Sequence, residues 1–192
     1  MSPLEIFGFV TGALCVWLLV RQNIWNWPIG IANNVLFIAL FYRSGLYADV
    51  GLQFFYIAIG LYGWWHWLHG EQDHGALPVS RTPPLWGAIL AAGVVAATAV
   101  ISWVLRRYTN STVPVLDSLI TALSLAAQFM MARKWIENWG VWIVANFISI
   151  GLLIYKGLYL TSGLYAVYQV LCVMGLLEWL RARRDAPVTS LA

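Results

Sequence analysis

Residues Ile24–Trp67 read IWNWPIGIANNVLFIALFYRSGLYADVGLQFFYIAIGLYGWWHW, and this stretch decides the fold. Its runs are too apolar for the surface of a soluble protein, yet Asn33, Asn34 and Gln53 lie in the middle of them. An unpaired amide in hydrocarbon costs free energy, so such side chains normally face the interior of a helix bundle or a watery cavity. The stretch therefore indicates a polar path inside a membrane.

The composition of the whole chain extends this interpretation. Of its 192 residues, 61% are hydrophobic and 10% are charged, and the mean hydropathy is +0.73. Apolar runs of membrane-spanning length predict an all-α, polytopic transmembrane helical bundle with seven helices. The predicted spans are 4–20, 28–42, 48–68, 85–105, 114–132, 139–155 and 161–180, which leave no room for a water-soluble domain.

The basic residues predict the orientation. If the spans alternate, one side receives Arg43, Arg106, Arg107 and Lys156, and the other receives Arg21, Arg81, Arg133, Lys134, Arg181, Arg183 and Arg184. Cytoplasmic loops carry the excess of basic residues. We therefore expect the C-terminus in the cytoplasm and the N-terminus outside.

The chain repeats itself at an offset of 112 residues, without a gap, over the segment 21–68. The pairs of identical residues include Asn26 and Asn138, Trp27 and Trp139, Asn34 and Asn146, Tyr56 and Tyr168, Gly63 and Gly175, and Trp67 and Trp179. Biased composition accounts for a few leucine matches but hardly for these together.

This offset predicts two parallel three-helix repeats joined by a linker helix. Residues 4–68 would form the first repeat, 85–105 the linker helix, 114–180 the second repeat and 181–192 a cytoplasmic tail. Three helices and one linker make four crossings, so the second repeat enters the membrane from the same side as the first. Secondary transporters with parallel repeats bind their substrate between the halves.

The second helix of each repeat is the first candidate for the binding site. Trp27 and Asn34 share one helical face, and Trp139, Trp142 and Asn146 share the corresponding face of the later span. Short or interrupted spans at matching places in two halves point to a transporter binding site. The alternative for the amides is hydrogen bonding between helices.

The span 114–132 adds a polar stripe that the first repeat lacks. It consists of Asp117, Thr121, Ser124 and Gln128, which follow one another along one helical face. Such a stripe does not face lipid cheaply, so we expect an asymmetric site weighted toward the second repeat. Asp117 could instead be an acidic residue favoured by the dipole at the start of its helix.

Aromatic side chains follow one face of the third span and of the last. Gln53 and Tyr56 on the third span, with Tyr168 on the last, favour a box that stacks on a flat, cationic ring. Tryptophan is also typical of membrane interfaces. We interpret the tryptophans near span ends in that way, namely Trp65, Trp67, Trp86, Trp103 and Trp179.

Several other classes of function find no support. The cluster His66, His69, Glu71, Asp73 and His74 lacks the ligand spacing of a zinc site and indicates a solvated turn. The chain has no GxxxxGK[ST] motif for ATP, no basic stripe for nucleic acid and no paired intramembrane charges for an ion relay. We expect a passive facilitator without metal, cofactor or catalytic residues. An intramembrane enzyme and an assembly subunit remain as alternatives.

Three segments carry a family resemblance: RQNIWNWPIGIANN, SGLYADVGLQFFYIAIGLYGWWHW and RKWIENWGVWIVANFISIGLLIYKGLY. They resemble the nicotinamide riboside transporter family, PnuC, across nearly the whole chain. The resemblance implies a bacterial inner-membrane protein of 3+1+3 helices, similar in fold to SWEET sugar transporters, that forms homotrimers. It also implies facilitated diffusion of nicotinamide riboside, which a cytoplasmic kinase traps by phosphorylation.

The same resemblance assigns roles to particular residues. Gln128, Asn138, Trp139, Trp142 and Asn146 would hold the nicotinamide and the ribose, while Asn34, Gln53 and Tyr56 would close the other side. Relatives with this organisation are expected to carry thiamine or riboflavin. Thiamine also has a cationic ring, so an aromatic box does not distinguish the two, and a thiamine facilitator is the alternative.

Overall fold

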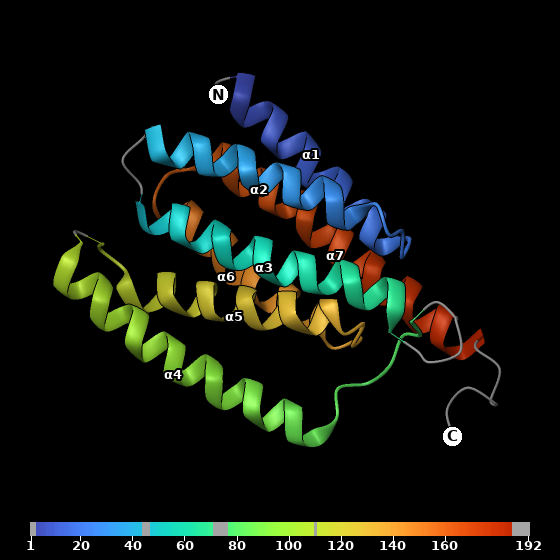
Figure 1. Ribbon diagram of the computed structural model, residues 1–192. Coiled ribbons are helices and arrows are strands. Elements are labelled where there is room, and N and C mark those ends of the chain that lie inside the picture. The colour runs from blue at the N-terminus through green and yellow to red at the C-terminus, as the bar shows by residue number, and fades with distance from the viewer. Residues whose placement is uncertain (1–2, 44–46, 71–76, 110, 186–192) are drawn as a thin grey trace.

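The computed structural model describes residues 3–43, 47–70, 77–109 and 111–185, and it is helical almost throughout. The elements are α1 (Pro3–Val20), α2 (Asn26–Arg43), α3 (Tyr47–His69), α4 (Pro84–Tyr108), α5 (Pro114–Ala132), α6 (Asn138–Tyr155) and α7 (Tyr159–Asp185). Figure 1 shows them as one bundle of roughly aligned helices. The predicted all-α fold with seven helices is confirmed.

Within the described residues, four helices are long and apolar enough to cross a membrane by length and composition, namely α4, α5, α6 and α7. The apolar part of α1 is the shorter segment Val10–Val20. The helices α2 and α3 contain amides and histidines that lower their hydropathy.

Some helix boundaries differ from the predicted spans. The helix α2 begins at Asn26, before Pro28, because a proline in the first turn removes only an N–H that has no partner within the helix. The helix α7 continues to Asp185, beyond the predicted end at residue 180, so part of the predicted tail is helical.

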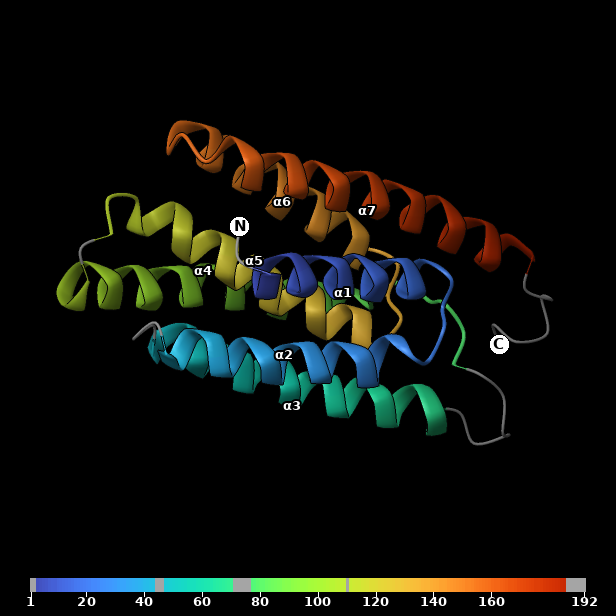
Figure 2. The same ribbon diagram turned by 90° about the horizontal axis from the view of Figure 1, so that it is seen from above.

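The helices form two halves, α1 to α3 and α5 to α7, and α1 and α5 lie in the middle of the bundle. Figure 2 shows α1 and α5 in the middle, with α2 and α3 on one side and α6 and α7 on the other. The helix α1 packs against α2 and α7, and α5 packs against α6 and α3. In the described part of the chain α4 packs against α5 alone.

Two tryptophans join the halves by reciprocal hydrogen bonds. The indole N–H of Trp67 donates to the carbonyl of Met131 at 3.3 Å, and that of Trp179 donates to the carbonyl of Leu19 at 3.2 Å. The two indole rings lie 6.2 Å apart. Their exposed fractions are only 6% and 0%. The interpretation of Trp67 and Trp179 as interfacial residues is therefore wrong, because both close the centre of the bundle.

Each half also contains a tryptophan seated on a glycine. The ring of Trp27 covers Gly63, and the ring of Trp139 covers Gly175. Each ring then meets the neighbouring indole edge to face at 5.4 Å: Trp27 meets Trp67, and Trp139 meets Trp179. A Cβ at either glycine would overlap the six-membered ring above it. Glycine is therefore required at both positions.

We predict that Gly175→Ala destabilises the folded protein by about 1–3 kcal/mol, because the added methyl group overpacks a buried, rigid ring. The measurement is the unfolding midpoint in detergent. Gly151→Ala is the control, since a Cβ there meets no other atom within 4 Å. Equal midpoints for the two variants would contradict the packing described above.

Candidate functional site

A cavity of about 310 Å³ lies between the two halves. Its walls come from five helices, α1, α2, α3, α6 and α7, and from the end of α5. The lining residues are Gly12, Cys15, Val16, Leu19, Asn26, Trp27, Gly30, Ile31, Asn33, Asn34, Tyr56, Gly60, Gln128, Met131, Trp139, Trp142, Asn146, Tyr165, Tyr168 and Cys172. None of these described lining residues is charged.

Many lining residues occupy equivalent positions in the two halves. Identical pairs at the offset of 112 are Trp27 and Trp139, Asn34 and Asn146, and Tyr56 and Tyr168. The cavity therefore has a tryptophan, an asparagine and a tyrosine on each side.

At other equivalent positions the two halves differ. Gly30 corresponds to Trp142, and Val16 corresponds to Gln128. A Cβ at Gly30 would meet only the Sγ of Cys15, at 3.9 Å. The second half thus supplies an extra ring and an extra amide, and the first half leaves open space.

Several polar groups of the cavity make hydrogen bonds within the described part of the chain. Asn146 Nδ2 donates a long hydrogen bond of 3.5 Å to the Sγ of Cys172. Asn33 Oδ1 lies 2.9 Å from the hydroxyl of Thr11. The indole N–H groups of Trp27 and Trp139 are buried and have no acceptor among the described residues. A buried donor without a partner is costly to the folded state.

The structure brings most of the predicted site residues together. Those that line the cavity are Asn34, Tyr56, Gln128, Trp139, Trp142, Asn146 and Tyr168. Trp139 has a second task, because the same ring packs on Gly175 and on Trp179.

Four predicted residues do not line the cavity. Gln53 is buried elsewhere on α3. The side chain of Asn138 donates to the carbonyl of Trp135 at 2.6 Å and so holds the turn before α6. The hydroxyl of Thr121 donates to the carbonyl of Asp117 within its own helix. Side-chain bonds to a nearby backbone group satisfy polar residues without exposing them.

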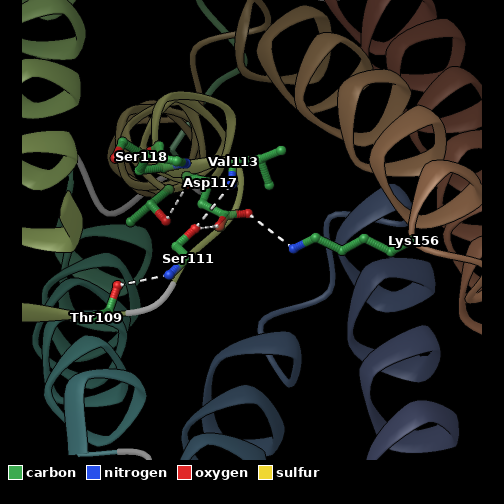
Figure 3. A network of polar contacts seen from close by, with 8 residues as sticks. Thr109, Ser111, Val113, Asp117, Ser118 and Lys156 are labelled. Carbon is green, nitrogen blue, oxygen red and sulfur yellow. Dashed lines mark hydrogen bonds and ion pairs between the residues drawn. The ribbon is translucent and has the colours of Figure 1, made fainter.

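The fourth residue, Asp117, lies in a separate polar network at the start of α5 (Figure 3). Its carboxylate accepts a hydrogen bond of 2.6 Å from the hydroxyl of Ser111 and lies 3.7 Å from the Nζ of Lys156. The ion pair ties the start of α5 to the end of α6. This geometry agrees with the alternative that Asp117 is an acid near a helix start.

Several lining residues had no individual role in the predicted site: Cys15, Asn26, Gly30, Asn33, Tyr165 and Cys172, and also Trp27, which the sequence placed on the candidate face with Asn34. A signal existed for three of them. Asn33 adjoins Asn34, Tyr165 precedes Tyr168 by about one helical turn, and Trp27 repeats as Trp139. Nothing in the sequence marked the two cysteines, which resemble ordinary buried apolar residues.

The histidine and acid cluster after α3 is only partly described. Glu71, Asp73 and His74 lie outside the described residues. Elsewhere in the described chain, no three His, Cys, Asp or Glu side chains gather as metal ligands.

The fold of this chain is similar to that of a protein of known crystal structure. The vitamin B3 transporter PnuC superposes on this chain with a TM-score of 0.73 at 24% identity, over 96% of this chain and 83% of its own. The superposition shows that the two chains share a fold.

Two curated relatives are similar in sequence over nearly their whole length. The nicotinamide riboside transporter PnuC of Escherichia coli strain K12 is 28% identical over 96% of this chain and 88% of its own. The riboflavin/roseoflavin transporter RibM of Streptomyces davaonensis is also 28% identical, over 95% and 87%.

A family model described as nicotinamide mononucleotide transporter matches residues 2–181. The match extends over all seven helices, apart from the last turn of α7. The family resemblance found in the sequence is thereby confirmed. The chain belongs to the nicotinamide mononucleotide transporter family, and it is a multi-pass membrane transporter rather than an enzyme.

Proposed function

We propose that this transporter takes up nicotinamide riboside by facilitated diffusion across the bacterial inner membrane. The observation that carries the proposal is the cavity between the halves, which combines aromatic rings and amides and has no charged residue in its described lining. The two PnuC relatives, one known by sequence and one by structure, support the choice of substrate.

The chemistry of the cavity suits a cationic ring joined to a sugar. The rings of Trp27, Trp139, Trp142, Tyr56 and Tyr168 surround the space, and aromatic faces attract a cation by about 0.5–2 kcal/mol per contact. Asn34, Gln128 and Asn146 offer donors and acceptors for a carboxamide and for hydroxyl groups.

The same lining argues against a phosphorylated substrate. A phosphate group at neutral pH carries close to two negative charges, and sites for it normally provide arginine, lysine or a helix N-terminus. No arginine or lysine is among the described lining residues. We therefore propose that the substrate is the riboside rather than the mononucleotide. Phosphorylation of the riboside by a cytoplasmic kinase would trap it after entry.

Riboflavin is a second candidate, because RibM is as similar to this chain as PnuC of Escherichia coli. The cavity of about 310 Å³ is at the small end of ligand pockets. A single pyridinium ring fits this volume better than three fused rings. Thiamine, whose ring is also cationic, remains the alternative within the same chemistry.

The transport mechanism follows from the paired contacts. We propose that residues 4–68 and 114–180 are parallel repeats, joined by the linker helix 85–105, that rock against each other around the cavity. The matched tryptophan contacts at an offset of 112 support this proposal. We also propose that the ends of α3, α5 and α7 lie on the cytoplasmic side, with the N-terminus outside, because cytoplasmic loops carry the excess of basic residues.

A homotrimer is the proposed assembly. The helix α4 contacts only α5 in the described part of the chain and exposes an apolar surface. Its exposed residues include Leu85, Ile89, Val95, Val100 and Trp103. A neighbouring subunit or lipid would cover them.

Binding to the purified protein tests the substrate. We expect calorimetry to show binding of nicotinamide riboside and much weaker binding of nicotinamide mononucleotide, because the cavity offers its phosphate no cation. Thiamine and riboflavin complete the series. Preferential binding of riboflavin or of the mononucleotide would contradict the proposed substrate.

Removing one cavity amide tests the site. Asn146→Ala should lower the affinity for the riboside about fivefold, since one hydrogen bond between neutral groups contributes roughly 1 kcal/mol. Ser149→Ala is the matched control, because this buried hydroxyl lies one turn further along α6, outside the cavity. Equal affinities for the two variants would exclude Asn146 from the site.

Filling the open space beside Gly30 tests the asymmetry of the cavity. Gly30→Leu should abolish riboside uptake by occupying part of the cavity, with little change in folding, because a Cβ there meets only Cys15. Gly151→Leu makes the same change where the surroundings are open. Normal uptake by the Gly30 variant would show that the ligand does not use this space.

A further inference from the structure

Within the described residues, Lys134 is a buried cation without an acidic partner. It is 4% exposed and lies in the turn between α5 and α6. Its Nζ donates to the carbonyl of Leu77 at 2.7 Å, lies 3.4 Å from Oε1 of Gln22 and sits 4.4 Å from the ring centre of Trp67. No carboxylate lies within 4 Å in the described chain. Lysine is almost never buried in this way without a paired acid.

This lysine lies where the two halves meet. Gln22 occupies the equivalent position in the first half, and the two residues share a left-handed backbone with φ of 52° and 51°. Gln22 and Trp67 belong to the first half, and Lys134 belongs to the second. The Nζ contacts therefore cross the boundary between the halves.

The contacts form layers at one end of the cavity. Leu19 and Met131 line the cavity, and their carbonyls accept the bonds from Trp179 and Trp67. Gln22 and Lys134 follow three residues later along the chain and do not line the cavity. The Nζ of Lys134 contacts both Gln22 and the ring of Trp67 there.

The energetics of these layers favour reversible opening. Each indole bond contributes only modest net stability. Burial lowers the pKa of Lys134 to about 8. The charged side chain is therefore held at a cost, and it regains hydration when the halves separate.

We propose that this end of the cavity is a gate, in which the indole bonds of Trp67 and Trp179 hold the halves together and the charge of Lys134 favours their separation. This gate rests on the proposed transport function. The two tryptophans and Lys134 therefore have opposite effects. Removing an indole bond should favour the open gate, and removing the charge of Lys134 should favour the closed gate.

Thiol labelling tests the gate directly. Cys15 lines the cavity, and with Cys172→Ala it is the single thiol of the chain. A membrane-impermeant maleimide is applied to right-side-out and to inside-out vesicles. Trp67→Phe and Trp179→Phe retain an aromatic ring but remove the indole N–H donor. Each should raise the labelling rate of Cys15 about fivefold from the face where α3 and α7 end.

Lys134→Met should lower the labelling rate from that same face, because methionine retains the packing on Trp67 without a charge to hydrate. Trp103→Phe is the matched control, since Trp103 lies on α4 and is 62% exposed. Its labelling should equal that of the parent. Gel filtration identifies any variant that does not fold.

Unchanged labelling in both folded Phe variants would overturn the gate, and faster labelling of Lys134→Met would overturn the role of the charge. Labelling needs no substrate. If the predicted labelling pattern is found but nicotinamide riboside is not transported, the gate stands and the proposed substrate fails.

Discussion

The structure depends on the reciprocal bonds between two indoles and two helix ends. The carbonyl of Leu19 accepts a backbone hydrogen bond from the N–H of Gln22, and that of Met131 accepts one from the N–H of Lys134. The indoles of Trp179 and Trp67 each add a second donor to these carbonyls. Because each indole comes from the opposite half, the two bonds join the ends of α1 and α5 to the other half.

The position of the cavity follows from this arrangement. The bonded carbonyls belong to residues that line the cavity, so the tryptophans close the space at one end without entering it. The glycines below Trp27 and Trp139 let these rings lie flat against α3 and α7. The side chains of Trp27 and Trp139 thus both pack the helices together and line the cavity.

Much of this could be predicted from the sequence, because membrane helices and repeated residues leave strong signals. The offset of 112 identified Trp139 and Asn146 as cavity residues before their surroundings were known. Helical periodicity could not tell a side chain that faces a cavity from one that bonds its own backbone, which is why Asn138 and Thr121 were misplaced. It also could not separate an interfacial tryptophan from a buried one, since both occur near helix ends, as Trp67 and Trp179 do.

The double task of Trp139 has a consequence for how relatives diverge. A ring that packs on Gly175 cannot change size without loss of the fold, so it cannot be the position at which new substrates are acquired. Diversification is left to the unequal pairs, such as Gly30 with Trp142 and Val16 with Gln128, where the two halves already differ. A protein with two similar halves can in this way keep the same structural contact in each half and change its substrate at the few positions where the halves differ.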